Sequence, residues 1–417
     1  MKKYLTIILA VLMCVSLVAC GGEKAPTNGD NDIETTPGAV ETPNVDETPK
    51  KSFDDLKAEF AAKTADDLIN ESFADKANPT EDEFAKLYEN YAFVDYNDSY
   101  EFGDNTVKEA IKLLKDSGVK VTNAYSPVVI EALIASEYPN ARMFIYREQA
   151  SNNIDAGASI YHPLLDKALT ETDPAVVYGV LKGLPQSYGD NEAFWTYALS
   201  FASSDDANVR KAVAMAYSRI AIENKDAAVE AAIVLMADEN TEVKQNALRY
   251  AGCVGDDRVI ESYRAILMNE ESKSFHGNAF LGLTELWYGY PSHKNTSEAG
   301  YRLAMDYLKQ ETTNPDIPTW SGMTSFKLKG AQKNYDEWRA VATYFDEREV
   351  VSIMLGLVAD AEATKNVKSS AIDMIAAWGT LEDAQAAKAT VEALSDDNND
   401  KASLITKCDS AITKLSK

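Results

Sequence analysis

The sequence predicts an all-α fold in which helical hairpins stack into an α-α superhelix. Small and apolar residues around Val209 recur every three to four positions, which is the period of a helix with one buried face. The same pattern returns at intervals of 33, 34 and 32 residues, led by Val176, Val209, Val243 and Phe275. A polar turn follows each match and leaves room for a second helix. Such a period is typical of a solenoid.

The first nineteen residues are expected to be a signal peptide. Lys2 and Lys3 precede an apolar run, Leu5–Val18, that is too short to span a bilayer comfortably. The run ends at Cys20 in the sequence Leu-Val-Ala-Cys, which resembles the lipobox of bacterial lipoproteins. The resemblance implies that residues 1–19 are removed and that Cys20 carries a lipid such as palmitate. It also implies anchoring at the extracytoplasmic face of the cell membrane. An ordinary secretion signal that ends in cysteine is the alternative.

Residues 20–50 are expected to form a disordered acidic tether. Gly, Pro, Thr, Asn, Asp and Glu dominate there, so burial cannot offset the entropy of ordering the chain. The whole chain carries a formal net charge of −25, which repels nucleic acid and anionic headgroups. The predicted partners are therefore another protein and, through the lipid at Cys20, the membrane. Nucleic acid is not a predicted partner.

Residues 51–125 are predicted to be helical but less regular than the rest. Thr80 and Glu83 form a capping box ahead of an aromatic stripe, and a second box, Thr106 with Glu109, opens another helix. The stretch between them, residues 91–104, is compatible with a short strand pair or with a loop.

The solenoid is predicted to occupy residues 126–417. In each repeat an A helix carries the shared pattern and a B helix follows. The B helices are expected at 190–203, 225–238, 256–269 and 297–311. A later A helix runs from Val367 to Trp378, and Trp338 fits the pattern loosely. Residues 312–333 break the period with two prolines and two glycines. They are predicted to be a loop insertion, which in solenoids often lies on the binding face.

These repeats resemble HEAT repeats, including the bacterial kind related to phycobilin-lyase repeats. The stretch Val209–Ile220 matches best, with Asp206 ahead of it and Arg210 in second place. Two other repeats carry lysine in place of that arginine, at Lys244 and Lys368. The resemblance implies an α-superhelix used mainly as a protein-binding scaffold. It implies no particular chemistry.

Sequence motifs for catalysis are absent. The three histidines, at 162, 276 and 293, do not flank a glutamate as in a zinc-protease helix. No nucleophile elbow, phosphate-binding loop or dinucleotide fingerprint occurs. We therefore expect no enzymatic activity, no metal and no cofactor. Cys253 is expected to be a buried small hydrophobe in a repeat helix, with no disulfide to Cys408.

Two acidic stretches resemble calcium loops. Residues 95–101 place oxygen donors at alternate positions but lack the sixth-position glycine and the twelfth-position glutamate. Residues 396–400 have the donors without the spacing. A polar turn or helix cap is the favoured alternative for both.

The predicted binding surface combines aromatic and charged residues. Its members are Arg258, Glu261, Trp287, Tyr288, Tyr290, Trp320, Lys327 and Lys329. The apolar stripe of the B helix at 256–269 turns Arg258 and Glu261 outward. Aromatic residues beside an irregular loop suit a sugar ring or a hydrophobic knob on a partner. Core packing is the alternative for the aromatic residues, and it is favoured for Trp287.

Taken as a set, these features predict a membrane-anchored, non-catalytic scaffold that binds another protein. The alternative is a lipoprotein that captures a glycan or another small ligand with the aromatic insertion region.

Overall fold

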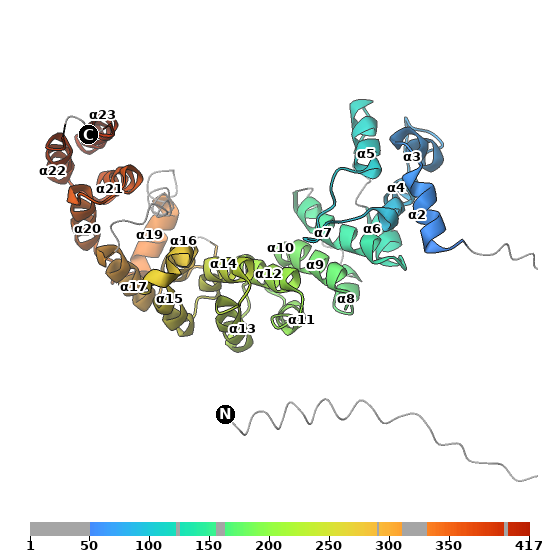
Figure 1. Ribbon diagram of the computed structural model, residues 1–417, viewed down its shortest axis with the longest axis horizontal. Coiled ribbons are helices and arrows are strands. Elements are labelled where there is room, and N and C mark those ends of the chain that lie inside the picture. Colours follow the sequence, from blue (N-terminus) through green and yellow to red (C-terminus); the bar gives the residue numbers. More distant parts are fainter. Residues whose placement is uncertain (1–50, 122–125, 156–162, 290–291, 311–331, 396–398) are drawn as a thin grey trace, which may run out of the picture. The chain divides into compact units, whose positions relative to one another are not determined.

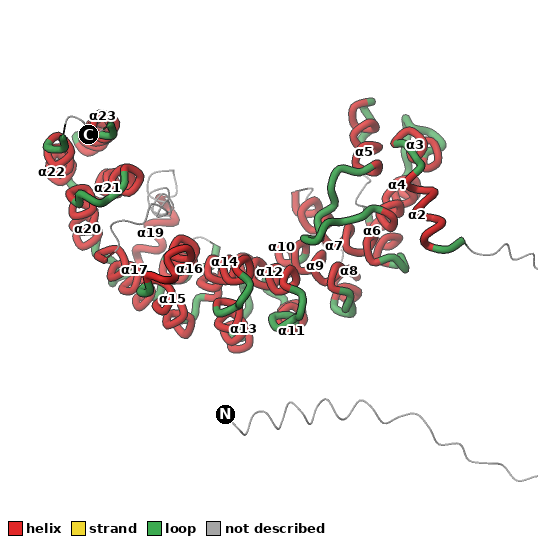
Figure 2. Tube along the Cα trace, viewed as in Figure 1, coloured by secondary structure: helices red, strands yellow, loops and turns green. Residues whose placement is uncertain are grey.

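Helices make up most of the described chain. The computed structural model describes residues 51–121, 126–155, 163–289, 292–310, 332–395 and 399–417. Within these ranges it contains 21 α-helices and no β-strand (Figure 2). The prediction of an all-α solenoid is confirmed. Residues 52–417 form one compact unit.

The N-terminal helices are the irregular part of the fold. They are α2 (Phe53–Ala61), α3 (Ala65–Ser72), α4 (Glu81–Glu89), α5 (Thr106–Asp116), α6 (Pro127–Ile134), α7 (Pro139–Asp155) and α8 (Pro163–Ala168). The capping box of Thr80 and Glu83 is confirmed at the start of α4. The second box is wrong by one residue: Asn105 caps α5 by accepting the Lys108 amide at 3.0 Å, because Thr106 is already helical.

Residues 91–104 form a 3₁₀ helix followed by a turn. The 3₁₀ helix is η1 (Asn90–Phe93), and a single antiparallel bridge then joins Tyr96 to Phe102. The Asn97 side-chain oxygen accepts the amides of Ser99 and Glu101, at 2.9 and 3.0 Å. That oxygen therefore holds the turn together, which supports the polar-turn alternative over a calcium loop.

Four helical hairpins form the regular part of the solenoid. The A helices are α9 (Pro174–Gly183), α12 (Ala207–Ala216), α14 (Thr241–Tyr250) and α16 (His276–Trp287). The B helices are α11 (Glu192–Ser200), α13 (Asp226–Met236), α15 (Ile260–Leu267) and α17 (Glu298–Gln310). Each A helix packs against the A helices of its neighbours, and α7 extends this layer by packing against α9 (Figure 1). All four hairpins lie where the period predicts them.

Short segments complete the hairpins. They are α10 (Pro185–Tyr188), η3 (Tyr217–Arg219), η4 (Ala251–Val254), η5 (Asp257–Val259) and η6 (Glu270–Phe275). The segments α10, η3 and η4 directly follow the A helices α9, α12 and α14. They tighten the turn that leads into the B helix.

Three A helices begin at the same kind of side-chain cap. Asp173, Asp206 and Asn240 each lie three residues before the leading valine of their helix. In each case one side-chain oxygen accepts two first-turn amides, at 2.7–3.2 Å. These oxygens satisfy donors that a helix N-terminus leaves without a partner. The cap recurs with the repeat, so successive A helices start in the same register.

The A layer is packed closely enough for helix backbones to touch. A Cβ atom at Gly183 would lie 1.9 Å from the carbonyl oxygen of Tyr146 on α7. No residue with a side chain fits there without moving one of the helices. This contact fixes α7 against α9, and the candidate functional site lies on these two helices.

The C-terminal helices continue the stack. They are α19 (Gln332–Val341), α20 (Glu347–Ala359), α21 (Lys365–Trp378), α22 (Leu381–Glu392) and α23 (Lys401–Leu415). Helix α20 packs against α17 and α22, while α21 packs against α20 and α23. The predicted insertion lies largely outside the described residues, because 311–331 are not among them and α19 begins at Gln332. The acidic stretch at 396–400 is likewise only partly described.

Candidate functional site

Two predicted aromatic binding residues, Trp287 and Tyr288, lie in the core. They are 1% and 5% exposed. The Trp338 ring of α19 meets Tyr288 edge-on at 4.5 Å between centroids, and its Nε1 donates to the Trp287 carbonyl at 3.0 Å. Core packing therefore holds for both residues. The expectation that they contact a partner is corrected, since neither ring offers surface in this structure.

Arg258 and Glu261 are exposed, as the apolar stripe of their helix predicts. The Arg258 guanidinium lies 2.9 Å from Asp226 on α13 and 2.8 Å from Asp256. Glu261 lies 3.3 Å from Arg264. The charge of Arg258 is thus met by carboxylates of this protein, and its contact with Asp226 ties η5 to the preceding B helix, α13.

The other predicted site residues lie outside the described ranges. They are Cys20, Tyr290, Trp320, Lys327 and Lys329. The lipidation site and the insertion therefore stay predictions.

The most distinctive surface in the described chain is a basic cavity beside α7 and α9. Its volume is about 400 Å³, and its charged lining residues are Arg147, Lys182 and Arg219, with no carboxylate among the residues that line it. These cations come from α7, α9 and η3, which belong to successive repeats. Three cations around one cavity, two of them without a carboxylate partner in the described chain, are unusual on a chain of net charge −25. The cavity is therefore a place where an anion is attracted.

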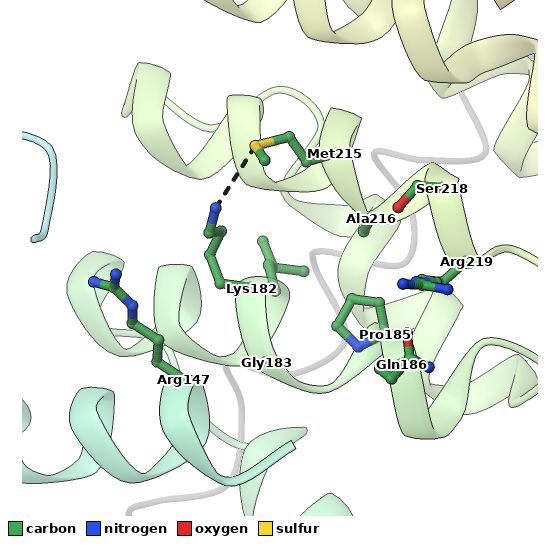
Figure 3. Close-up of a pocket in the computed structure, with 10 residues that line it drawn as sticks. Arg147, Lys182, Gly183, Pro185, Gln186, Met215, Ala216, Ser218 and Arg219 are labelled. Carbon is green, nitrogen blue, oxygen red and sulfur yellow. Dashed lines mark hydrogen bonds between the residues drawn. The ribbon is translucent and has the colours of Figure 1, made fainter. Parts of the chain in front are cut away.

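A thioether contacts the lysine that lines this cavity. Lys182 points toward Met215 of α12, with Arg147 on the neighbouring helix (Figure 3). The Lys182 ammonium lies 3.8 Å from the Met215 sulfur. No carboxylate of the described chain pairs with Lys182 or with Arg219 within 4.0 Å. Both side chains are thus available to a ligand.

Burial sets the electrostatics of Lys182. Desolvation lowers the pKa of its ammonium, and the charges of Arg147 and Lys211 lower it further, while Glu101 opposes them. A lowered pKa means that the charged form lacks full compensation. An anion entering the cavity would supply that compensation.

A carboxylate of the chain itself is already bound at the edge of the cavity. Glu101, in the turn after η1, forms an ion pair with Arg147 and accepts a hydrogen bond from the Tyr178 hydroxyl at 3.1 Å. Burial raises the pKa of Glu101, but Arg147, Tyr178 and Lys182 outweigh it and hold the pKa below its usual value. These residues therefore stabilise a carboxylate in its ionised form.

A second cavity adjoins the first through Arg147. Its volume is about 350 Å³, and its other cations are Lys108, Lys112 and Lys115 on α5. It also contains Asp116 and Glu148, and the Tyr91 and Phe144 rings at its base stack at 3.6 Å between centroids. We call the combined surface the basic groove, defined by Lys108, Lys112, Lys115, Arg147, Lys182 and Arg219.

Nothing in the lining of the basic groove resembles a catalytic set. Neither cavity is lined by a histidine or a cysteine. The arrangement provides positive charge and hydrogen-bond donors, which suits the binding of an anion.

The sequence contained a signal for this groove that motif searching does not detect. Arg147, Lys182 and Arg219 follow one another at about the repeat period. In a solenoid, residues one repeat apart lie side by side. A search for charges that recur with the repeat, instead of for local clusters, finds all three.

Comparison with known protein families and with characterised proteins finds no match for this sequence. In the described part of the chain, no helix combines the length and the apolar character needed to cross a bilayer.

Proposed function

We propose that this protein is a lipid-anchored, extracytoplasmic scaffold of HEAT-like repeats that binds an acidic segment of a partner protein in the basic groove. The observation that carries the proposal is the row of cations across α7, α9 and η3, with Lys182 and Arg219 unpaired in the described chain. The lipobox-like sequence at Cys20 supports the anchor. No catalytic role is proposed.

The size of the groove favours a short segment of extended chain. Packed helix axes lie about 8–10 Å apart, so three successive elements of the A layer span about 20 Å. An extended chain rises about 3.3 Å per residue, so about six residues cover that distance. The binding of Glu101 by Arg147 and Tyr178 shows how a carboxylate is held there.

The charge of the whole protein limits the kind of partner. A strongly acidic partner is repelled at long range, although salt screens this repulsion beyond about 8 Å at physiological ionic strength. Attraction in the groove then acts only at close approach. The partner we propose therefore has a short acidic segment on a surface that is otherwise neutral or basic.

Peptide binding tests this proposal directly. The mature protein in detergent is titrated with fluorescent hexapeptides of glutamate or glutamine, and anisotropy is measured. We expect the glutamate peptide to bind and the double variant Lys182→Glu, Arg219→Glu to lose at least tenfold in affinity, since attraction becomes repulsion.

A charge-matched control separates local from global effects. Arg264→Glu with Lys273→Glu makes the same change in net charge at one exposed and one partly exposed residue, neither of which lines the groove. This control should bind like wild type. Equal binding by both double variants, or equal binding of both peptides, would contradict the proposal. Crosslinking in membrane extract would then identify the natural partner.

Capture of a small acidic glycan is the second candidate. The lysines Lys108, Lys112 and Lys115 around the second cavity favour it, because cations that line a cavity suit the carboxylate of a sugar acid. A hexuronic acid that displaces the glutamate peptide at lower concentration than free glutamate would favour this function. Glycan capture by the insertion itself stays a proposal about residues outside the described ranges.

A further inference from the structure

Three metal-binding side chains meet where the third and fourth hairpins join. Cys253 lies in η4, Glu285 lies in α16, and His293 lies in the loop after α16. One donor atom from each lies within 4.8 Å of the other two. The group shares no residue with the basic groove.

His293 has a side chain that is about nine-tenths buried, with an unused nitrogen aimed at this group. Its side chain is 9% exposed, and its Nδ1 has no hydrogen-bond partner. The nearest carboxylate oxygen, Glu285 Oε2, lies 3.7 Å away, beyond hydrogen-bond distance. A buried polar nitrogen without a partner costs stability, so native structures rarely leave one. A ligand between His293 and Glu285 would remove this cost.

A buried amide holds the backbones of two of these residues together. The Asn295 side chain donates to the carbonyl oxygens of Gly252, Cys253 and Glu285, at 3.1, 3.3 and 3.2 Å. Gly255 makes room for it: its φ is +67°, and a Cβ there would lie 2.1 Å from Asn295 Oδ1. The positions of Cys253 and Glu285 are therefore set from outside the group, as supporting residues set metal ligands.

A closed loop places the third residue. The carbonyl of Gly289 accepts the amides of His293 and Lys294, at 2.7 and 2.9 Å. Lys294 has a φ of +55°, which residues with side chains rarely adopt. This turn brings the chain back onto η4 and directs His293 toward Cys253 and Glu285.

We propose that Cys253, Glu285 and His293 bind Zn²⁺ through Sγ, a carboxylate oxygen and Nδ1. Thiolate and imidazole donors suit zinc, whereas Mg²⁺ and Ca²⁺ take oxygen donors. In a tetrahedral zinc site the nitrogen and oxygen ligands lie about 3.4 Å apart, close to the 3.7 Å between His293 and Glu285. The three residues leave one position for water.

An ion can reach this site from solvent, and its binding would have a structural consequence. The Glu285 side chain is 43% exposed, so an ion reaches the site past it, while Cys253 is almost fully buried. The ion would tie η4 of the third hairpin to α16 and to the loop that leads into α17. Zinc binding would therefore stabilise the junction between two repeats.

Cobalt spectroscopy and thermal unfolding test the site on the full chain in detergent. After treatment with a chelator, the protein is titrated with Co²⁺, whose thiolate complex absorbs in the near ultraviolet. We expect one Co²⁺ per chain with that absorption, displacement by Zn²⁺, and a higher Tm in Zn²⁺. Cys253→Ser should lose the absorption, and His293→Gln should bind at least tenfold more weakly.

Cys408→Ser is the matched control, because Cys408 is the other buried cysteine of the described chain and lies in α23. It should keep the absorption and the rise in Tm. Circular dichroism checks that each variant is folded, and His293→Gln remains informative if Cys253→Ser unfolds. A wild type without the absorption, or a folded Cys253→Ser that still has it, would overturn the proposal. Binding of the glutamate peptide is measured in parallel, so failure here is distinguishable from failure of the basic groove.

Discussion

The guanidinium of Arg210 donates to both carboxylate oxygens of Asp238, at 2.7 and 3.0 Å, and so ties an A helix to the turn that precedes the next one. It also donates to the Ser204 carbonyl six residues earlier, at 2.7 Å. Arg142 on α7, two layers before, makes the corresponding contacts, with Glu171 at 3.0 Å and the Ser136 carbonyl at 2.9 Å.

Lysines at the equivalent position of later repeats find other partners. Lys244 lies over the Phe275 ring, 4.9 Å from its centroid. Lys368 donates to the Val358 carbonyl at 3.0 Å. The basic residue in second place of the repeat thus connects neighbouring hairpins, whichever partner is present.

Removing this arginine should destabilise the protein. We expect Arg210→Met to lower the free energy of unfolding by about 2 kcal/mol, because Asp238 is left poorly solvated and without its charged donor. Arg302→Met is the control, since Arg302 is half exposed and pairs with Glu349 at the surface, which is worth less than about 1 kcal/mol. Urea unfolding followed by circular dichroism measures both. Equal losses of unfolding free energy in the two variants would show that the contact of Arg210 with Asp238 contributes no more than a surface ion pair.

Close packing of α7 on α9 should not tolerate a methyl group. Gly183→Ala places Cβ against the Tyr146 carbonyl and should cost about 2 kcal/mol, because the helices must separate. Gly356→Ala is the matched control: it lies within α20 with nothing within 4 Å of its Cβ position. There alanine should stabilise by about 0.5–1 kcal/mol through helix propensity. An unfolding midpoint below wild type for Gly183→Ala and above wild type for Gly356→Ala would confirm the packing. A midpoint above wild type for both variants would contradict it.

Acid should weaken the C-terminal repeats through Asp383. The Arg348 guanidinium, together with Thr380, holds the pKa of this carboxyl well below its usual range despite burial. An unfolded aspartate takes up a proton near pH 3.9, whereas folded Asp383 does not. Its stabilisation is therefore present at neutral pH and is lost as the pH falls below about 4. We expect Tm to fall less steeply in Asp383→Asn than in wild type between about pH 5 and about pH 2.5. Parallel curves would refute this role.

The lipid anchor predicts a chemical change at one residue. Cys20→Ser should abolish incorporation of a labelled fatty acid, because serine lacks the thiol that is acylated. The protein then either stays in the membrane with its signal peptide uncleaved or is released unlipidated from the detergent-rich phase. Cys408→Ser should leave both properties unchanged. Fatty-acid labelling that persists in Cys20→Ser would remove the basis for the anchor.

The sequence contained enough local information for the helices and little for the sites. Hairpin positions followed from the period, and Asp173, Asp206 and Asn240 began their helices as turn chemistry requires. The sequence did not decide whether Trp287 and Tyr288 are buried, because aromatic residues near a loop serve equally well in a core or in an interface. Only their contacts with Trp338, fifty residues away, distinguish the two.

Residues of both proposed sites are far apart in the chain. Cys253, Glu285 and His293 have none of the close spacing by which zinc sites are found in sequences. Their approach depends on Asn295 and on the loop closed at Gly289. A motif search of the sequence detects neither the Asn295 contacts nor the closed loop.

Fold class, repeat length and helix starts were determined by the sequence itself, because hydrophobic periodicity and capping act between residues at most a few positions apart. The tertiary structure decided which side chains share a surface. It set Arg147, Lys182 and Arg219 side by side by stacking three repeats, and it buried Trp287 beneath α19. The physical reason is that a solenoid joins residues one repeat apart through the packing of neighbouring helices. That packing depends on contacts such as Gly183 against Tyr146, which no single helix contains.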